Sequence, residues 1–239
     1  LFLYPKFEEK IKSLFGGRKF GVRDAVFLVA MMGALITVLV FIPQMAIMIL
    51  FLFCYSVVLF MITYLAIPRW YLAVLTPTSF ILLYAFFWNI LFLNLFAMVF
   101  AVFVSIYLGG QFTWKTTCIF ASLLTLVDVI QVLGTRFMVA SSEKMLALQL
   151  PVVVILPTFP SEGRAILGLG DVFLAGLLSI QTTKKYGKKL GLVTAASITV
   201  FFFSLYTFLL NIRFGYFPAT VLIIGGWLIV VGARCLHSI

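Results

Sequence analysis

The sequence predicts an all-α polytopic membrane protein, and three observations support this prediction. Of the 239 residues, 64% are hydrophobic and only 10% are charged, whereas about 25% of the residues of soluble domains are charged. The mean hydropathy is +1.22. The apolar residues form long runs, and a helix needs about 20 such residues to cross a bilayer. No water-soluble fold hides this much apolar surface, so we expect lipid to surround much of the chain.

Eight stretches have the length and composition of membrane-spanning helices. They cover residues 24–42, 45–67, 70–89, 91–109, 115–133, 166–183, 190–212 and 217–235. The helix-breaking residues Pro43, Pro68 and Pro218 fall near proposed ends. The apolar stretch 70–110 is too long for one spanning helix at ~1.5 Å per residue, so we divide it near Asn89. We expect a single transmembrane domain over residues 1–239.

The basic residues predict how the chain is oriented in the membrane. Placing the N-terminal segment inside leaves only four of the 17 basic residues outside: Arg136, Lys144, Arg164 and Arg213. This distribution follows the positive-inside rule. We therefore expect the basic loops and the C-terminus to be cytoplasmic and the connection 134–165 to lie outside. The net charge of +10 is assigned to topology and anionic lipid rather than to nucleic acid.

The long connection 134–165 is predicted to contain a short β-strand. Its apolar run 150–156 is rich in β-branched residues, which favour a strand over a ninth helix. Such a segment could rest on or enter the membrane, or its edge could pair with an extended peptide. The sequence leaves both interpretations open.

Only two of the seven acidic residues, Asp128 and Asp171, lie within predicted spans, and Asp24 is placed to cap the first span. An ionised carboxylate in hydrocarbon costs at least ~2.5 kcal/mol, so such residues indicate a functional site. Asp128 lies five residues before Leu133, where its span ends, and Asp171 five residues after Ile166, where the next span begins. Both carboxyls are therefore expected roughly 8 Å below the same outer surface.

Two facing carboxyls without a counter-ion are expected to share a proton, because like charges a few Å apart cannot both ionise. The ionised member can accept a proton from water, and the protonated member can donate one to a scissile carbonyl oxygen. The same carboxylates could instead line a proton or cation pathway. The aspartates alone do not separate a protease from a transporter.

Three short motifs accompany the aspartates. Gly168–Asp171 reads Gly-Leu-Gly-Asp, residues 127–139 run from Val-Asp through Gly-Thr to Met-Val, and Phe217–Thr220 reads Phe-Pro-Ala-Thr. Together they resemble the Gly-x-Gly-Asp signature, the first-aspartate segment and the Pro-Ala-Leu motif of the presenilin and signal peptide peptidase family. The agreement covers residues 115–235, about half of the chain. Two positions differ, because Val127 stands where the family usually has Tyr and Thr220 where it has Leu.

The resemblance implies an intramembrane aspartic endopeptidase that cuts transmembrane helices or signal peptides with an aspartate dyad and water. An archaeal presenilin-like protease, oriented like signal peptide peptidase, fits best. The family has nine spans, so an earlier helix ending at Leu1–Pro5 would complete the count. Residues 1–113 would be scaffold helices and 114–239 catalytic helices. Besides Asp128 and Asp171, the implied active-site residues are Gly168, Leu169, Gly170, Pro218, Ala219 and Thr220.

Several alternatives remain at this stage. A preflagellin or prepilin peptidase also uses Gly-x-Gly-Asp, a channel or transporter could use the same carboxylates, and a non-catalytic scaffold is a third option. A metalloprotease or a Ser–His protease fits poorly, because the chain lacks a His-Glu-x-x-His motif and has a single histidine, His237. We expect no metal or other cofactor and no nucleic acid. The expected partners are a transmembrane substrate and the lipid bilayer, and the oligomeric state stays open.

Overall fold

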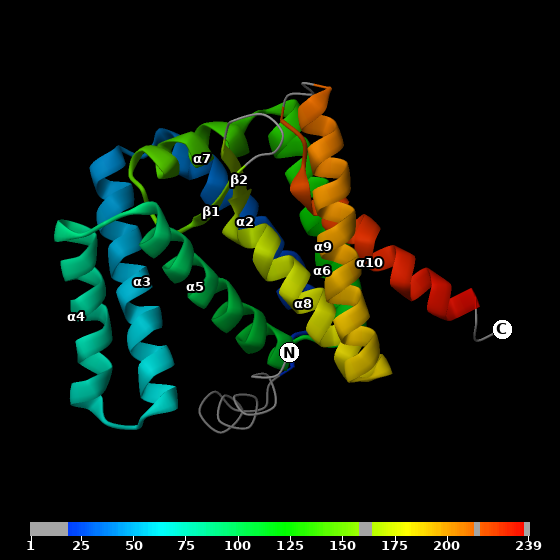
Figure 1. Ribbon diagram of the computed structural model, residues 1–239, viewed down its shortest axis with the longest axis horizontal. Coiled ribbons are helices and arrows are strands. Elements are labelled where there is room, and N and C mark those ends of the chain that lie inside the picture. The colour runs from blue at the N-terminus through cyan, green and yellow to red at the C-terminus, as the bar shows by residue number, and fades with distance from the viewer. Residues whose placement is uncertain (1–18, 158–163, 213–215, 237–239) are drawn as a thin grey trace.

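The computed structural model describes residues 19–157, 164–212 and 216–236, so Leu1–Pro5 lie outside the described residues. The described chain is a bundle of helices with one small sheet (Figure 1). The helices are α2 (Val22–Phe41), α3 (Gln44–Ala66), α4 (Trp70–Phe86), α5 (Ile90–Gln111), α6 (Trp114–Val129), α7 (Phe137–Ala147), α8 (Leu169–Tyr186), α9 (Lys188–Asn211) and α10 (Ala219–Leu236). The predicted all-α class is confirmed.

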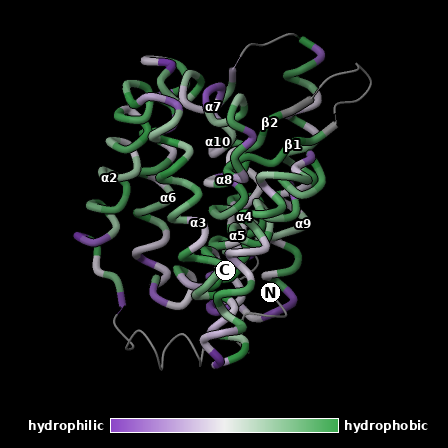
Figure 2. Tube along the Cα trace, turned by 90° about the vertical axis from the view of Figure 1, so that its left-hand side faces the viewer, coloured by the Kyte–Doolittle hydropathy of each residue, from purple (hydrophilic) through white to green (hydrophobic). Residues whose placement is uncertain are grey.

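Six helices in the described part of the chain are long and apolar enough to cross a membrane. They are α2, α3, α5, α6 with its extension to Gly134, α9 and α10. Large apolar side chains point outward from the bundle, among them Phe41 and Phe86, which are 75% and 74% exposed. Hydrophobic residues cover most of the helix lengths and hydrophilic ones lie mainly near the ends (Figure 2). These features are those of a multi-pass membrane protein.

A helix occupies each of the eight predicted segments, and Asn89 and Asp24 make hydrogen bonds at the starts of two of them. Asn89 begins α5, since its Oδ1 accepts hydrogen bonds of 3.0 Å from the backbone N–H groups of Leu91 and Phe92. Asp24 accepts a 2.8 Å hydrogen bond from the backbone N–H of Gly21 at the start of α2. Two of the eight helices fall outside the set of six: α4 is shorter, and α8 carries several charged residues. Eight membrane crossings therefore stay a prediction.

The connection between α6 and α8 contains more structure than its sequence predicts. The predicted strand is confirmed as β1 (Val153–Pro157), but it pairs antiparallel with β2 (Arg164–Gly168), which lies partly within the predicted span 166–183. The helix therefore begins at Leu169 and not at residue 166. The two glycines next to this start are weak helix formers, and the β-branched β1 offers the preceding residues a strand partner. The 11-residue helix α7 is a second feature that was not predicted.

Helix α8 lies at the centre of the half of the bundle that holds the aspartates (Figure 1). It packs against α5, α6, α9 and α10. Its apolar side chains Phe173, Leu174, Leu177 and Leu178 are buried in the largest core cluster. Its polar residue Gln181 donates two 2.9 Å hydrogen bonds to backbone carbonyls at the end of α5. This packing fixes the helix that carries the second aspartate.

Candidate active site

The two buried aspartates occupy opposite ends of consecutive long helices. Asp128 lies in the last turn of α6, and the five-residue π-helix η1 (Ile130–Gly134) follows it directly. Asp171 lies in the first turn of α8, two residues after the helix begins and closer to the helix end than the sequence predicts. Each is only 8% exposed. Short π-helical turns inside helices occur frequently at functional sites.

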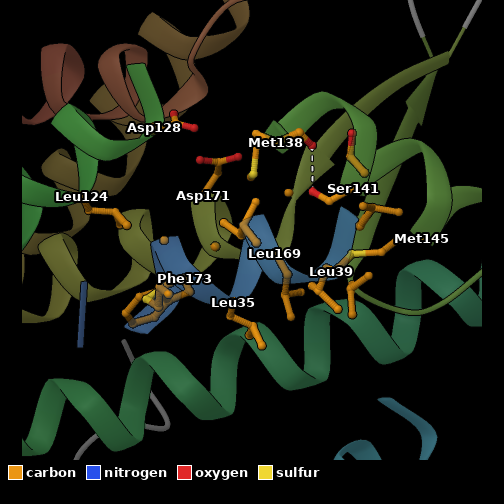
Figure 3. Close-up of a pocket in the computed structure, with 18 of the residues that line it drawn as sticks. Leu35, Leu39, Leu124, Asp128, Met138, Ser141, Met145, Leu169, Asp171 and Phe173 are labelled. Carbon is orange, nitrogen blue, oxygen red and sulfur yellow. Dashed lines mark hydrogen bonds between the residues drawn. The ribbon is translucent and has the colours of Figure 1, made fainter. Parts of the chain in front are cut away.

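Both carboxyl groups line one cavity of about 400 Å³. Figure 3 shows them turned toward the same part of this cavity, and they are close enough for their charges to interact. The walls come from α2, α3, α5, α6, α7, α8, both strands and α10, and they are mostly apolar. The described residues that line the cavity include no lysine, arginine or histidine. The structure thus brings together two carboxyls that are separated by 43 positions in the sequence.

The Pro-Ala-Thr segment contacts the site through its third residue. Thr220 is buried in the first turn of α10, and its hydroxyl donates a 2.6 Å hydrogen bond to Oδ2 of Asp128. Its backbone N–H also faces this carboxyl. Pro218 is buried and Ala219 begins the helix, but neither lines the cavity. The third residue of this segment is therefore the one that touches an aspartate.

The Gly-Leu-Gly segment forms the junction between β2 and α8. All three residues line the cavity, but the two glycines differ. A Cβ atom at Gly168 would lie 3.0 Å from Oδ2 of Asp171, so this position has no room for a side chain without a shift of the carboxyl. A Cβ atom at Gly170 would meet nothing within 4 Å. Leu169 connects the junction to the residue before β1, because its N–H donates a 3.0 Å hydrogen bond to the carbonyl of Val152.

Helix α7 covers one side of the cavity (Figure 3), to which it contributes four side chains: Met138, Ser141, Ser142 and Met145. It is tied to α2 by Lys144, whose Nζ donates hydrogen bonds to the carbonyls of Val40 and Ile42. Tyr216 donates a 3.1 Å hydrogen bond to Glu143 and so connects α7 to the segment before α10. This hydrogen bond and the charge of Glu143 raise the pKa of Tyr216.

Gln131 is a further cavity residue that the sequence analysis missed. It lies in the π-helix, is 7% exposed, and donates a 2.8 Å hydrogen bond from Nε2 to the carbonyl of Gly33 on α2. This bond fixes the π-turn that follows Asp128 against a neighbouring helix. A polar amide three residues after an intramembrane aspartate was a signal that could have identified it.

Among the described residues, no group of three His, Cys, Asp or Glu side chains is arranged to hold a metal ion. Comparisons of the chain with protein-family models, with curated proteins and with solved structures found no match.

Proposed function

We propose that this protein is an intramembrane aspartyl protease with Asp128 and Asp171 as its catalytic pair. The observation that carries the proposal is that two buried carboxyls from separate helices share one apolar cavity. A carboxyl pair in such surroundings holds a single proton between its members and so offers a base and an acid at once. The motif resemblance described above supports the same activity, and the protein would cross the membrane eight times within residues 24–235.

The reaction follows from this shared proton. One carboxylate takes a proton from water while the water oxygen bonds to the scissile carbonyl carbon, and the other carboxyl gives its proton to the carbonyl oxygen. The resulting diol collapses when the carbon–nitrogen bond breaks. The leaving nitrogen takes the proton that the first carboxyl had accepted, and a diol hydroxyl returns a proton to the second. The catalyst ends in its starting state, and no covalent intermediate with the enzyme is formed.

The contacts of the two carboxyls favour one assignment of roles. The hydroxyl of Thr220 donates a 2.6 Å hydrogen bond to Oδ2 of Asp128, and a donor in this position favours the ionised form of a carboxyl. The backbone N–H of the same threonine faces it as well. We therefore assign Asp128 as the base that activates water and Asp171 as the acid that protonates the carbonyl oxygen.

The substrate would be a single transmembrane helix or a signal peptide. Helical amides are protected by their own hydrogen bonds, so the segment to be cut must unwind before water reaches it. Strand β2 leads directly into the cavity at Gly168, and a strand edge can bind an unwound segment through backbone hydrogen bonds. Met138 and Met145 offer flexible apolar contacts that suit varied side chains. With the orientation predicted from the basic residues, both aspartates would lie near the outer face of the membrane, and water would enter from that side.

The test compares purified wild type with Asp128→Asn and Asp171→Asn on a transmembrane peptide in detergent, with new termini identified by mass spectrometry. Asp24→Asn is the matched control, since this aspartate caps α2 away from the cavity. We expect cutting by wild type and by the control, and none by the two folded dyad variants. Cutting that persists in either dyad variant would exclude the proposed pair.

Two alternatives predict other results in the same preparation. Cleavage restricted to a prepilin-type leader peptide would indicate a prepilin peptidase. A wild-type protein that cuts no peptide, but carries protons or cations across liposomes in a manner dependent on Asp128, would indicate an ion pathway instead.

A further inference from the structure

Helix α5 carries an amide whose environment is unusual for a membrane helix. Asn94 lies between Leu93 and Leu95 in a helix of 22 residues that is apolar enough to span a bilayer. A side-chain amide is unfavourable in such a position unless its donor and acceptor are both satisfied. Asn94 lies inside the predicted span 91–109, and its sequence context alone indicates no role for it.

The donor and the acceptor of the Asn94 amide both form hydrogen bonds with the backbone of one residue of β1. Its Nδ2 donates a 2.9 Å hydrogen bond to the carbonyl of Ile155, and its Oδ1 accepts a 2.8 Å hydrogen bond from the N–H of Ile155. A neighbouring strand would make the same pair of bonds to this residue. The asparagine therefore takes the place of a third strand on the outer edge of β1, and the side chain of Leu93 packs in one apolar cluster with those of Val153 and Ile155.

These two bonds also indicate which backbone groups of β2 point to the free edge of the two-stranded sheet. Along two antiparallel strands, residue pairs that hydrogen-bond to each other alternate with pairs whose N–H and C=O groups point away from the partner strand. Ile155 lies opposite Ile166, and its N–H and C=O bond to Asn94 instead of to β2. Ile155 and Ile166 therefore form a pair that does not hydrogen-bond across the sheet. The N–H and C=O of Ile166 therefore lie on the edge of β2 away from α5. Two residues further along β2 is Gly168, beside the Asp171 carboxyl.

We propose that Asn94 is a positioning residue for peptide cleavage. It closes the β1 edge of the hairpin against α5, so that an unwound substrate can add only to the β2 edge, next to Asp171. It also holds the hairpin at the residue opposite Ile166 and so sets the distance of the bound peptide from the dyad. This inference rests on the proposed protease function.

The test measures where the substrate lies and where it is cut. A transmembrane peptide with a photo-crosslinking residue near its scissile bond is bound to Asp171→Asn protein, with and without Asn94→Leu, and the crosslinked residues are mapped. Cut positions, kcat and KM are measured with Asn94→Leu in the otherwise unchanged protein. Asn211→Leu is the matched control, because within the described part of the chain the amide of Asn211 donates to the carbonyl of Thr207 in its own helix.

We expect crosslinks on β2 and a single main cut site for wild type and for Asn211→Leu. Asn94→Leu is expected to add crosslinks on β1, to spread the cuts over neighbouring bonds and to lower kcat/KM by about 10-fold, since both hydrogen bonds that hold Ile155 are lost. A general loss of stability would not move the cut site. If Asn94→Leu does not fold, Asn94→Asp keeps the acceptor for the N–H of Ile155 and is expected to give a smaller change in the same direction.

A folded Asn94 variant with wild-type cuts, crosslinks and kinetics would overturn this inference and leave the protease function intact. Wild-type crosslinks on β1 would overturn it as well. A wild-type protein that cuts no peptide would instead overturn the proposed function, and this inference with it.

Discussion

The hydroxyl of Thr220 donates a 2.6 Å hydrogen bond to Oδ2 of Asp128, and both residues are buried. This contact joins the start of α10 to the end of α6 across 92 positions of sequence. A hydrogen bond to a charged group contributes about 1.5–3 kcal/mol. It holds the Asp128 carboxyl in one orientation at the cavity wall and defines the first prediction.

Thr220→Val replaces the hydroxyl by a methyl group of similar size. We expect kcat to fall roughly 10- to 100-fold, since 1.4 kcal/mol corresponds to a factor of ten. Thr220→Ser retains the hydroxyl and is expected to keep most of the activity. The measurement is the rate of peptide cleavage under saturating substrate, with thermal stability in detergent as the control for folding. Equal rates for the valine and serine variants would contradict the assigned role of this hydrogen bond.

Gly168→Ala and Gly170→Ala are expected to differ although they lie two positions apart. The new methyl at position 168 would lie 3.0 Å from the Asp171 carboxyl and 3.9 Å from Met138, so the carboxyl must move. The required shift is a few tenths of an ångström, and because a full 1 Å displacement in an active site can cost about 10²-fold, we expect kcat to fall by roughly 3- to 10-fold.

The methyl at position 170 meets open space inside the cavity. Alanine in place of glycine there should stabilise α8 by up to ~1 kcal/mol, and it should raise KM by occupying room that the substrate needs. Melting temperature and Michaelis–Menten kinetics of the two variants measure these differences. A Gly168→Ala enzyme that is as fast as Gly170→Ala would show that the Asp171 carboxyl tolerates displacement.

Gln181→Leu is expected to weaken the fold without changing the chemistry. The side chain is buried and donates to the carbonyls of Gly109 and Phe112 at the end of α5. Without the Gln181 amide, these two buried carbonyls each lose a hydrogen-bond donor, which lowers the free energy of unfolding by about 1–3 kcal/mol. It lies ten residues beyond Asp171 on α8, roughly 15 Å along the helix, so the cleavage rate per folded molecule should stay unchanged. Denaturation in detergent and active-site titration measure the two quantities separately, and a lower rate per active site would count against this separation.

The orientation of the chain can be tested by chemical labelling in sealed vesicles. Single cysteines at Glu143 on α7 and at Lys189 at the start of α9 are introduced after replacement of Cys54, Cys118 and Cys235. From the positive-inside rule we expect a membrane-impermeant maleimide to label position 143 from outside and position 189 only after permeabilisation. Labelling of both positions from the same side would contradict the predicted topology.

The sequence predicted the helical class and the two aspartates, because both depend on composition along the chain. Carboxyls are rare in apolar runs, so Asp128 and Asp171 stand out without any knowledge of packing. The sequence could not predict that Thr220 touches Asp128, since this depends on how α10 is rotated against α6.

Three other features were missed for local reasons. Ile166 and Leu167 continue an apolar run and so resemble the start of a span, whereas their strand conformation depends on pairing with Val154 and Ile155. Helix α7 is short and lies where a connection was expected, and a single amide such as Asn94 within an apolar helix has no sequence pattern that identifies its partner.

The first turns of two helices, α8 and α10, meet the aspartates. Asp171 belongs to the first turn of α8, and the backbone N–H of Thr220 in the first turn of α10 faces Asp128. The N-terminal end of a helix carries about half a positive charge, which arises from the peptide groups and not from any side chain. Part of the positive potential at the dyad is therefore encoded in the backbone path. A mutational scan would not detect it, and a protein designed to copy this site would have to reproduce the two helix starts as well as the residues.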